Sequence, residues 1–194
     1  MIAAIVLAAG QSTRMGSPKM LLSWGKRTVI GQVISVLIAG GIKEILVVTG
    51  GARKEVESAL QGYPVHLVHN PNYACGEMLS TFQTGLSALG EKVTAALITL
   101  GDQPGIEATV VHSVIQVYQT NHASIVVPSY KMRRGHPWIL DRELWSNALE
   151  LKKPATLRDF LNQYTNLINY LPVKTDSILL DLDTPEDYAW LRPK

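Results

Sequence analysis

The chain has 194 residues, of which 46% are hydrophobic and 18% are charged, and this composition excludes a disordered chain. One cysteine, Cys75, excludes an intrachain disulfide scaffold, and the apolar run at residues 1–9 is too short to cross a bilayer. The balance of 18 Lys and Arg against 16 Asp and Glu, a net charge of +2, argues against a nucleic-acid partner. We therefore expect a soluble, cytoplasmic protein of one domain, residues 1–194, with no membrane or nucleic-acid partner.

Short β-branched apolar runs alternate along the chain with segments of helical spacing. The alternation predicts strands at residues 2–8, 44–49, 65–69, 94–100 and 123–128, and helices at residues 28–39, 54–61, 76–89 and 107–119. Strands separated by helices are typical of βαβ units. We therefore predict an α/β protein with a three-layer αβα, Rossmann-like fold and a mostly parallel sheet.

Beyond residue 128 the pattern loosens. Residues 137–140 and 167–173 are predicted to be strands at an antiparallel edge of the sheet, and residues 143–149, 157–164 and 185–191 to be short helices. Thr184 is a candidate N-cap of the last helix, and Pro185 suits its first position.

A polar, glycine-containing loop follows the first predicted strand. Gly10 and Gly16 permit tight turns, Ser12 offers a hydroxyl group, and Arg14 and Lys19 bring two positive charges. Because ligands of such sheets bind at the carboxyl ends of the strands, convergent donors and cations here suit a polyphosphate. The loop matches neither the Walker A pattern nor the dinucleotide motif G-x-G-x-x-G. The alternative is a flexible turn with incidental charges.

Acidic residues follow the fourth predicted strand and precede the last helix. Asp102 lies in a Gly-Asp-Gln-Pro turn, and Asp181 and Asp183 flank Leu182, where an extended chain would point both acids to the same side. Two carboxylates with phosphate oxygens are typical ligands of Mg²⁺. The alternative for Asp102 is a turn-forming residue, and for Asp183 a helix cap, but capping accounts for one acid and not for two.

The segment LAAGQSTRMGSPK, residues 7–19, resembles the signature of the MobA-like nucleotidyltransferases. Within that family it most resembles the molybdenum cofactor cytidylyltransferase branch. The resemblance implies Mg²⁺ held by Asp102 and Asp183, with Arg14, Lys19 and Asp102 as catalytic residues. It also implies a nucleotide site formed by Leu7, Ala8, Ala9, Gly10, Ser12, Arg14, Gly16, Lys19, Gly76 and Ser80.

Two further segments carry the resemblance. The helix predicted to start at Gly76 offers free N–H groups, and with Ser80 it is similar to the family's segment near the nucleotide base, although Glu77 interrupts that pattern. Arg134, Gly135 and His136 resemble the G-H-P segment where the branch binds its acceptor, and arginine suits an anionic group. An ordinary amphipathic helix start and an incidental histidine are the alternatives. Cys75 is expected to be a bystander.

The resemblance implies transfer of a nucleoside monophosphate, CMP from CTP, to a phosphorylated acceptor of the molybdopterin type, with release of pyrophosphate. Ala8-Ala9-Gly10 favours the smaller base of CTP, because an alanine methyl group would crowd a purine. Transfer from GTP, a sugar-phosphate acceptor, and a non-catalytic carrier that passes nucleotide or pterin to a molybdenum enzyme remain alternatives. The sequence contains no cofactor-binding motif that would indicate an oxidoreductase.

Overall fold

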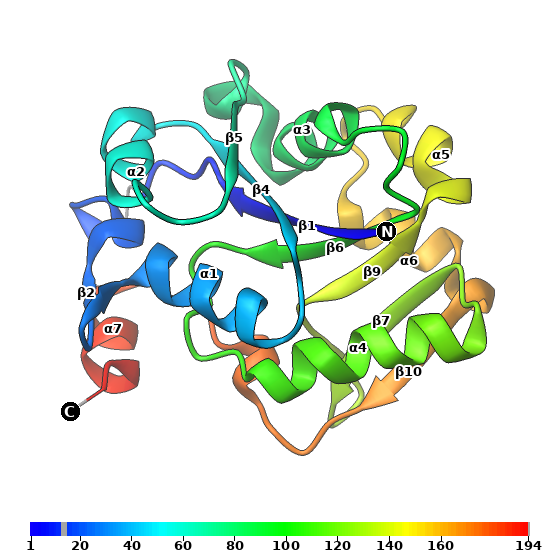
Figure 1. Cartoon of the computed structure of the whole chain (residues 1–194). Helices are drawn as coiled ribbons and strands as arrows, with labels where there is room; N and C mark the ends of the chain where they lie inside the picture. Colours follow the sequence, from blue (N-terminus) through cyan, green and yellow to red (C-terminus); the bar gives the residue numbers. More distant parts are fainter. Residues whose placement is uncertain (13–14, 194) are drawn as a thin grey trace.

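The computed structural model describes residues 1–12 and 15–193, and only the backbone at residues 76 and 77. A mixed eight-stranded sheet lies at its centre in the order β10-β7-β9-β6-β1-β4-β5, with β8 paired to β7 (Figure 1). The strands are β1 (Ile2–Ala8), β4 (Glu44–Thr49), β5 (His66–His69), β6 (Ala95–Leu100), β7 (Ile125–Tyr130), β8 (Arg133–Arg134), β9 (Trp138–Asp141) and β10 (Ile168–Pro172).

Helices cover both faces of this sheet (Figure 1). One face carries α1 (Val29–Ala39), α2 (Arg53–Ala59) and α4 (Ala108–Asn121), and the other carries α3 (Tyr73–Ala88), α5 (Trp145–Leu149) and α6 (Leu157–Gln163). Strand β1 serves both layers: Ala4 and Val6 enter the first apolar cluster, whereas Ile5 and Leu7 enter the second. Side chains that alternate along a strand buried on both faces produce this division. The predicted three-layer α/β fold is confirmed.

The prediction of an antiparallel edge was wrong. Strand β9 is antiparallel, but it lies inside the sheet between β6 and β7, and the edge strand β10 runs parallel to β7. Trp138, Ile139 and Leu140 are all almost completely buried, which is the environment of an interior strand. The local sequence pattern predicts the strand but not the strands it pairs with, because that pairing depends on contacts between residues distant in the sequence.

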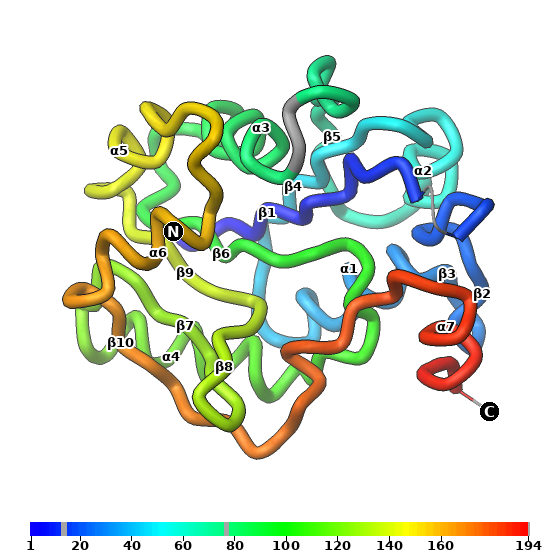
Figure 2. The backbone as a smooth tube through the Cα atoms, turned by 180° about the vertical axis from the view of Figure 1, so that it is seen from behind, coloured from blue at the N-terminus to red at the C-terminus, as the bar shows by residue number. Residues whose placement is uncertain are grey.

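The structure adds a small hairpin that the sequence pattern did not predict. Strands β2 (Ser23–Trp24) and β3 (Arg27–Thr28) pair antiparallel, and α7 (Pro185–Leu191) packs beside them (Figure 2). The hydroxyl group of Tyr188 donates a hydrogen bond of 2.6 Å to the carbonyl oxygen of Ser23. This contact brings the C-terminal tail to the segment that follows the first loop.

The carboxyl ends of β1, β6, β7 and β10 lie at one edge of the sheet, because β9 runs opposite to its two neighbours. The first loop, the turn after β6, the β7–β8 hairpin and the start of β9 therefore meet there. Among the residues that the structure describes, no helix is both long and apolar enough to span a bilayer.

Candidate active site

The first loop turns sharply and then directs Lys19 inward. Ser12 and Gly16 have φ angles of 53° and 64°, and the Ser12 hydroxyl oxygen accepts a hydrogen bond of 3.1 Å from the backbone N–H of Lys19. Met20, which follows in a single 3-10 turn, is buried in the core and anchors the end of the loop. The predicted catalytic residue Arg14 lies outside the described residues, as does Thr13.

The Lys19 ammonium group lies between two carboxylates that are far apart in the sequence. Its Nζ pairs with Oδ2 of Asp102, just after β6, and with Oδ1 of Asp183 at 3.1 Å. The Lys19 side chain is only 12% exposed and that of Asp102 is 13% exposed. Burial opposes the charged form of Lys19, but Asp102 and then Asp183 outweigh it, so the pKa of Lys19 is raised.

Leu182 holds the two tail acids in place. Its side chain is completely buried beside Trp24 and Val29, and its backbone N–H donates a hydrogen bond of 3.1 Å to the carbonyl oxygen of Asp102. The segment around it is not a strand, although Leu180 and Thr184 on either side have extended backbone angles. The predicted cap is confirmed, because Thr184 forms a capping box with Asp187. Asp183 is therefore not the N-cap residue of α7.

A third carboxylate, Asp181, adjoins this group and accepts a hydrogen bond from Nε2 of the buried Gln103. Burial and the negative charge of Asp102 raise the pKa of Asp181, whereas the Gln103 bond lowers it. Three acids and one lysine thus converge at the carboxyl edge of the sheet.

A cavity of about 360 Å³ opens over this cluster. It brings together four of the predicted nucleotide-site residues, Leu7, Ala9, Gly10 and Lys19, with both predicted metal ligands. The remaining lining residues are Met20, Tyr73, Met78, Thr81, Leu100 and Asp181.

Four other predicted nucleotide-site residues that the structure describes, Ala8, Ser12, Gly16 and Ser80, do not line this cavity. The methyl group of Ala8 lies in the hydrophobic core, on the side of β1 opposite to Leu7. Ser12 and Gly16 shape the loop. The Ser80 hydroxyl accepts a hydrogen bond of 2.9 Å from Nδ2 of the buried Asn70. Helix α3 begins at Tyr73, three residues before the predicted start at Gly76.

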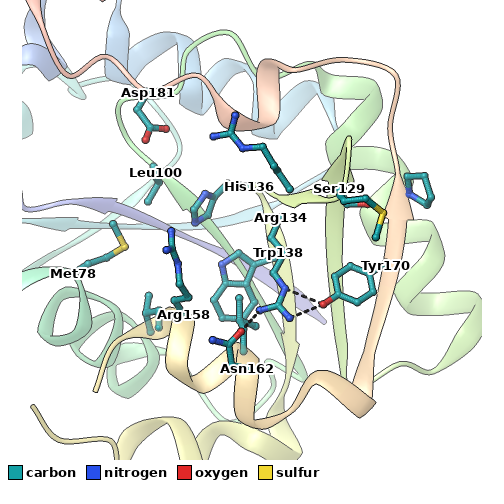
Figure 3. A pocket seen from close by; sticks show the side chains of 16 residues that line it. Met78, Leu100, Ser129, Arg134, His136, Trp138, Arg158, Asn162, Tyr170 and Asp181 are labelled. Atoms are coloured by element: carbon teal, nitrogen blue, oxygen red, sulfur yellow. Dashed lines mark hydrogen bonds between the residues drawn. The ribbon is translucent and has the colours of Figure 1, made fainter. Parts of the chain in front are cut away.

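A second, larger cavity of about 870 Å³ adjoins the first and shares Met78, Leu100 and Asp181 with it (Figure 3). The predicted acceptor residues Arg134, Gly135 and His136 all line it. The remaining lining residues are Ser129, Met132, Arg133, Trp138, Leu157, Arg158, Leu161, Asn162, Tyr170 and Pro172.

Gly135 and His136 are held against the tail segment. A Cβ atom on Gly135 would lie 2.5 Å from the carbonyl oxygen of Ile178, so only glycine fits there, and the backbone N–H of His136 donates to that oxygen at 3.1 Å. Desolvation by surrounding protein atoms lowers the pKa of His136 to about 4. The imidazole is therefore neutral near pH 7 and contributes neutral hydrogen bonds rather than a positive charge.

Several residues of the site were not predicted from the sequence. Gln103, which donates a hydrogen bond to Asp181, directly follows Asp102 and could have been read as a companion of the acids. Arg158 and Asn162 line the larger cavity and are four residues apart on α6. Each directly follows a buried leucine, Leu157 or Leu161, and this spacing of polar side chains was an available signal. Tyr170 is on an edge strand and carried no signal of its own.

The donor set suits a divalent cation. Oδ1 of Asp102 is buried and has no hydrogen-bond partner among the described residues, while Oδ2 already contacts a cationic group. Two carboxylates beside an open cavity leave room for phosphate oxygens and water, as Mg²⁺ or Mn²⁺ requires. Among the side chains that the structure describes, no group of three or more His, Cys, Asp or Glu is arranged to hold a metal ion, so an ion at this site would need phosphate oxygens and water as further ligands.

Comparison with known proteins identifies the family. The MobA-like NTP transferase domain matches residues 4–167. The chain belongs to this family. The MobA-like chain described here is accordingly a nucleotidyltransferase, as the resemblance of residues 7–19 predicted.

Two curated proteins are similar to this MobA-like chain over 95% of its length. Nicotine blue oxidoreductase of Paenarthrobacter nicotinovorans is 30% identical over 93% of its own length, and molybdenum cofactor cytidylyltransferase of Escherichia coli is 25% identical over 92%. Among solved structures, Rv0371c of Mycobacterium tuberculosis H37Rv is 27% identical with a TM-score of 0.85, covering 98% of this chain and 96% of its own. A manganese complex of Rv0371c is 28% identical with a TM-score of 0.80, covering 98% and 97%.

Proposed function

We propose that this protein transfers CMP from CTP to a phosphorylated acceptor, a molybdopterin-type molybdenum cofactor, and releases pyrophosphate. The contact of Lys19 with both Asp102 and Asp183 carries the proposal, because it gathers a cation and two carboxylates beside Gly10 in one cavity. The curated cytidylyltransferase, similar over 95% of the chain, supports the choice of nucleotide and acceptor.

In this proposal the nucleoside triphosphate lies over the loop after β1. Gly10, Ala9 and Lys19 line the smaller cavity, and Lys19 would turn from the carboxylates to the phosphate oxygens. Ala9, rather than Ala8, lines this cavity, and we assign the restriction of the base to Ala9. Arg14 is proposed to add a second positive charge from the same loop.

Asp102 and Asp183 would hold Mg²⁺ or Mn²⁺, and the manganese complex of Rv0371c supports a divalent ion in such a fold. The metal, when bound, neutralises charge on the phosphate groups. The chain's own residues position the reactants: the acceptor enters from the larger cavity, which joins the smaller one at Asp181 and Leu100. A phosphate acceptor is already ionised near pH 7, so attack on the α-phosphorus needs no strong general base.

The proposal is tested by measuring pyrophosphate release with each of the four common triphosphates, Mg²⁺ or Mn²⁺, and candidate phosphorylated acceptors. We expect a preference for CTP, and Asp102→Ala should lower the rate at least about 100-fold while nucleotide binding partly survives. Asp176→Ala, which removes an exposed acid of the same tail, is the matched control. Unchanged release in Asp102→Ala would contradict the metal site, and a preference for GTP would contradict the choice of CTP.

The 30% identity to nicotine blue oxidoreductase favours a second candidate, a redox function on the same fold. An oxidoreductase would consume a reduced cofactor, and the loop after β1 lacks the dinucleotide motif. An absorbance assay for oxidation of reduced nicotinamide or flavin nucleotides, without any triphosphate, separates the two candidates, because only an oxidoreductase would give a signal. Nucleotide binding without either reaction would favour a carrier for a molybdenum enzyme.

A further inference from the structure

The larger cavity contains an arginine whose hydrogen bonds define its neighbours. Arg134 donates from Nε and Nη2 to the Tyr170 hydroxyl oxygen at 2.9 and 2.6 Å, and from Nη1 to Oδ1 of Asn162 at 2.7 Å (Figure 3). Nη2 also reaches the Thr165 hydroxyl oxygen at 3.4 Å. Arg134 is thus engaged mainly with other protein groups.

These bonds leave Tyr170 and Asn162 with hydrogen-bond donors for a ligand. The Tyr170 hydroxyl oxygen already accepts two hydrogen bonds from Arg134, and its O–H proton is left to donate. At Asn162, Arg134 fixes the amide with its oxygen inward, so the two N–H groups of Nδ2 remain. In the part of the chain that the structure describes, neither group donates to another protein atom.

The charge around these donors is predominantly positive. The cavity is lined by Arg133, Arg134 and Arg158 against one acid, Asp181, and His136 is neutral near pH 7. No carboxylate of the described residues forms an ion pair with any of the three arginines. Unpaired guanidinium groups in a concave surface attract anions.

The donors and Asp181 occupy different ends of the cavity. In Figure 3, Asn162 and Tyr170 lie on the side opposite to Asp181 and Leu100, where the two cavities join, and Arg158 lies between them. A cavity of about 870 Å³ accommodates a small organic molecule that spans this length.

We propose that Asn162 and Tyr170, oriented by Arg134 and assisted by Arg158, form an oxyanion site at the far end of the acceptor cavity. The acceptor therefore carries a second anionic, oxygen-rich group, remote from the phosphate that receives the nucleotide. In a molybdopterin-type acceptor this group is the set of oxygen ligands on the molybdenum, and in the alternative phosphorylated acceptors it is a phosphate or a carboxylate. This assignment of the cavity to the acceptor depends on the proposed function. Arg134 is a positioning residue in this arrangement, and the direct contacts are made by Asn162, Tyr170 and Arg158.

One substitution replaces the hydrogen-bond donors of Asn162 by a negative charge without changing the size of the side chain. Asn162→Asp is nearly isosteric and keeps an oxygen for Arg134, with which it would form an ion pair, so the variant should fold. It replaces the N–H donors by a negative charge. Asn166→Asp makes the same change on an exposed residue that does not line the cavity, and it is the matched control.

The test is an NMR titration with inorganic phosphate and, separately, succinate, following the Asn162 side-chain amide and the Trp138 indole N–H. We expect saturable shifts in the wild-type protein and in Asn166→Asp. In Asn162→Asp, the indole shift should require at least about tenfold more ligand. Tyr170→Phe, which removes the O–H donor and nothing larger, should weaken binding in the same direction. Stronger binding of phosphate indicates a phosphate-bearing acceptor, and stronger binding of succinate a carboxylate-bearing one.

Absence of saturable shifts with both anions, or equal affinity in Asn162→Asp and the wild type, would overturn the oxyanion site. Binding of CTP with Mg²⁺ is measured on the same samples through resonances of the loop after β1. Anion binding without any nucleotide binding would overturn the proposed function while supporting the oxyanion site, so the two failures are distinguishable.

Discussion

At the scale of single residues, Lys19 takes the place between Asp102 and Asp183 that the proposed divalent cation would occupy. An ammonium group and a metal ion compete for the same carboxylate oxygens, because like charges repel strongly at such separations in a partly buried site. Binding of a triphosphate would give Lys19 new partners and leave the carboxylates to the metal.

Lys19→Met should therefore bind Mn²⁺ more tightly in the absence of nucleotide, by about tenfold, although its pyrophosphate release should fall. Free Mn²⁺ measured by electron paramagnetic resonance gives the affinity. Lys26→Met, on an exposed turn of the β2–β3 hairpin, is the control. Weaker Mn²⁺ binding in Lys19→Met would show that Lys19 supports the metal site instead of competing with the ion.

His136 predicts a dependence of stability on pH. Its pKa is about 4 in the folded protein against 6.5 for the free side chain, so the unfolded state binds more protons between these values. Above pH 6.5 His136 is neutral in both states and does not change the free energy of unfolding. As the pH falls from 6.5 toward 4, the unfolded state takes up the proton first, and the free energy of unfolding decreases. Denaturant unfolding should show a decrease of about 1–3 kcal/mol over this range.

His136→Gln should flatten that part of the profile, whereas His112→Gln, on the exposed surface of α4, should leave it unchanged. A profile of the same slope in His136→Gln and the wild type would indicate that His136 titrates normally in the folded protein.

At the scale of elements, the extended segment before α7 positions the tail acids. Leu182 is completely buried, and its N–H bond to Asp102 ties the segment to the turn after β6. The capping box of α7 fixes the direction in which the chain leaves this point. The hairpin of β2 and β3 supplies the surface on which the segment packs, so a peripheral element supports the central site.

Leu182→Ala should lower the free energy of unfolding by about 2–4 kcal/mol and also weaken Mn²⁺ binding, because the cavity left behind loosens Asp183. Leu86→Ala removes a side chain of equal size that is buried in the other apolar layer, and it should reduce stability without changing metal affinity. Chemical denaturation and Mn²⁺ titration of both variants check this. Equal metal affinity in Leu182→Ala and Leu86→Ala would show that the packing of the segment does not position Asp183.

At the scale of the whole molecule, the two apolar layers share one strand. Successive residues of β1 enter opposite layers, and β4 and β6 contribute to both as well. Because both layers pack against the same strands, unfolding of one layer would remove the sheet surface on which the other packs. This shared sheet supports the prediction of a single domain.

We therefore expect far-ultraviolet and near-ultraviolet circular dichroism to report one coincident thermal transition. Trp138 fluorescence reports on the second layer in a variant whose other tryptophans are replaced by phenylalanine. In that variant, the destabilising substitution Ile34→Ala on α1, in the first layer, should lower the midpoint temperature of the Trp138 transition. Two separate transitions would contradict the single domain.

The order of helices and strands could be predicted because hydrophobic periodicity is a local property. Strands β1 and β4 match their predicted limits, and helix α1 differs from its prediction only at Thr28, which caps it. The first loop could be selected as a ligand site because its charge and glycines directly follow a strand buried on both faces. Chemistry concentrated in one short segment is visible without any tertiary contact.

The sequence by itself determined the fold class, the loop after β1 and the acidic character of the tail, since each depends on residues adjacent in the chain. Only the tertiary structure decided that Lys19 bridges Asp102 and Asp183, that β9 lies inside the sheet, and that Arg134 orients Asn162 and Tyr170. These arrangements join segments separated by many residues. Their geometry follows from packing and burial of the whole chain, which no local pattern encodes.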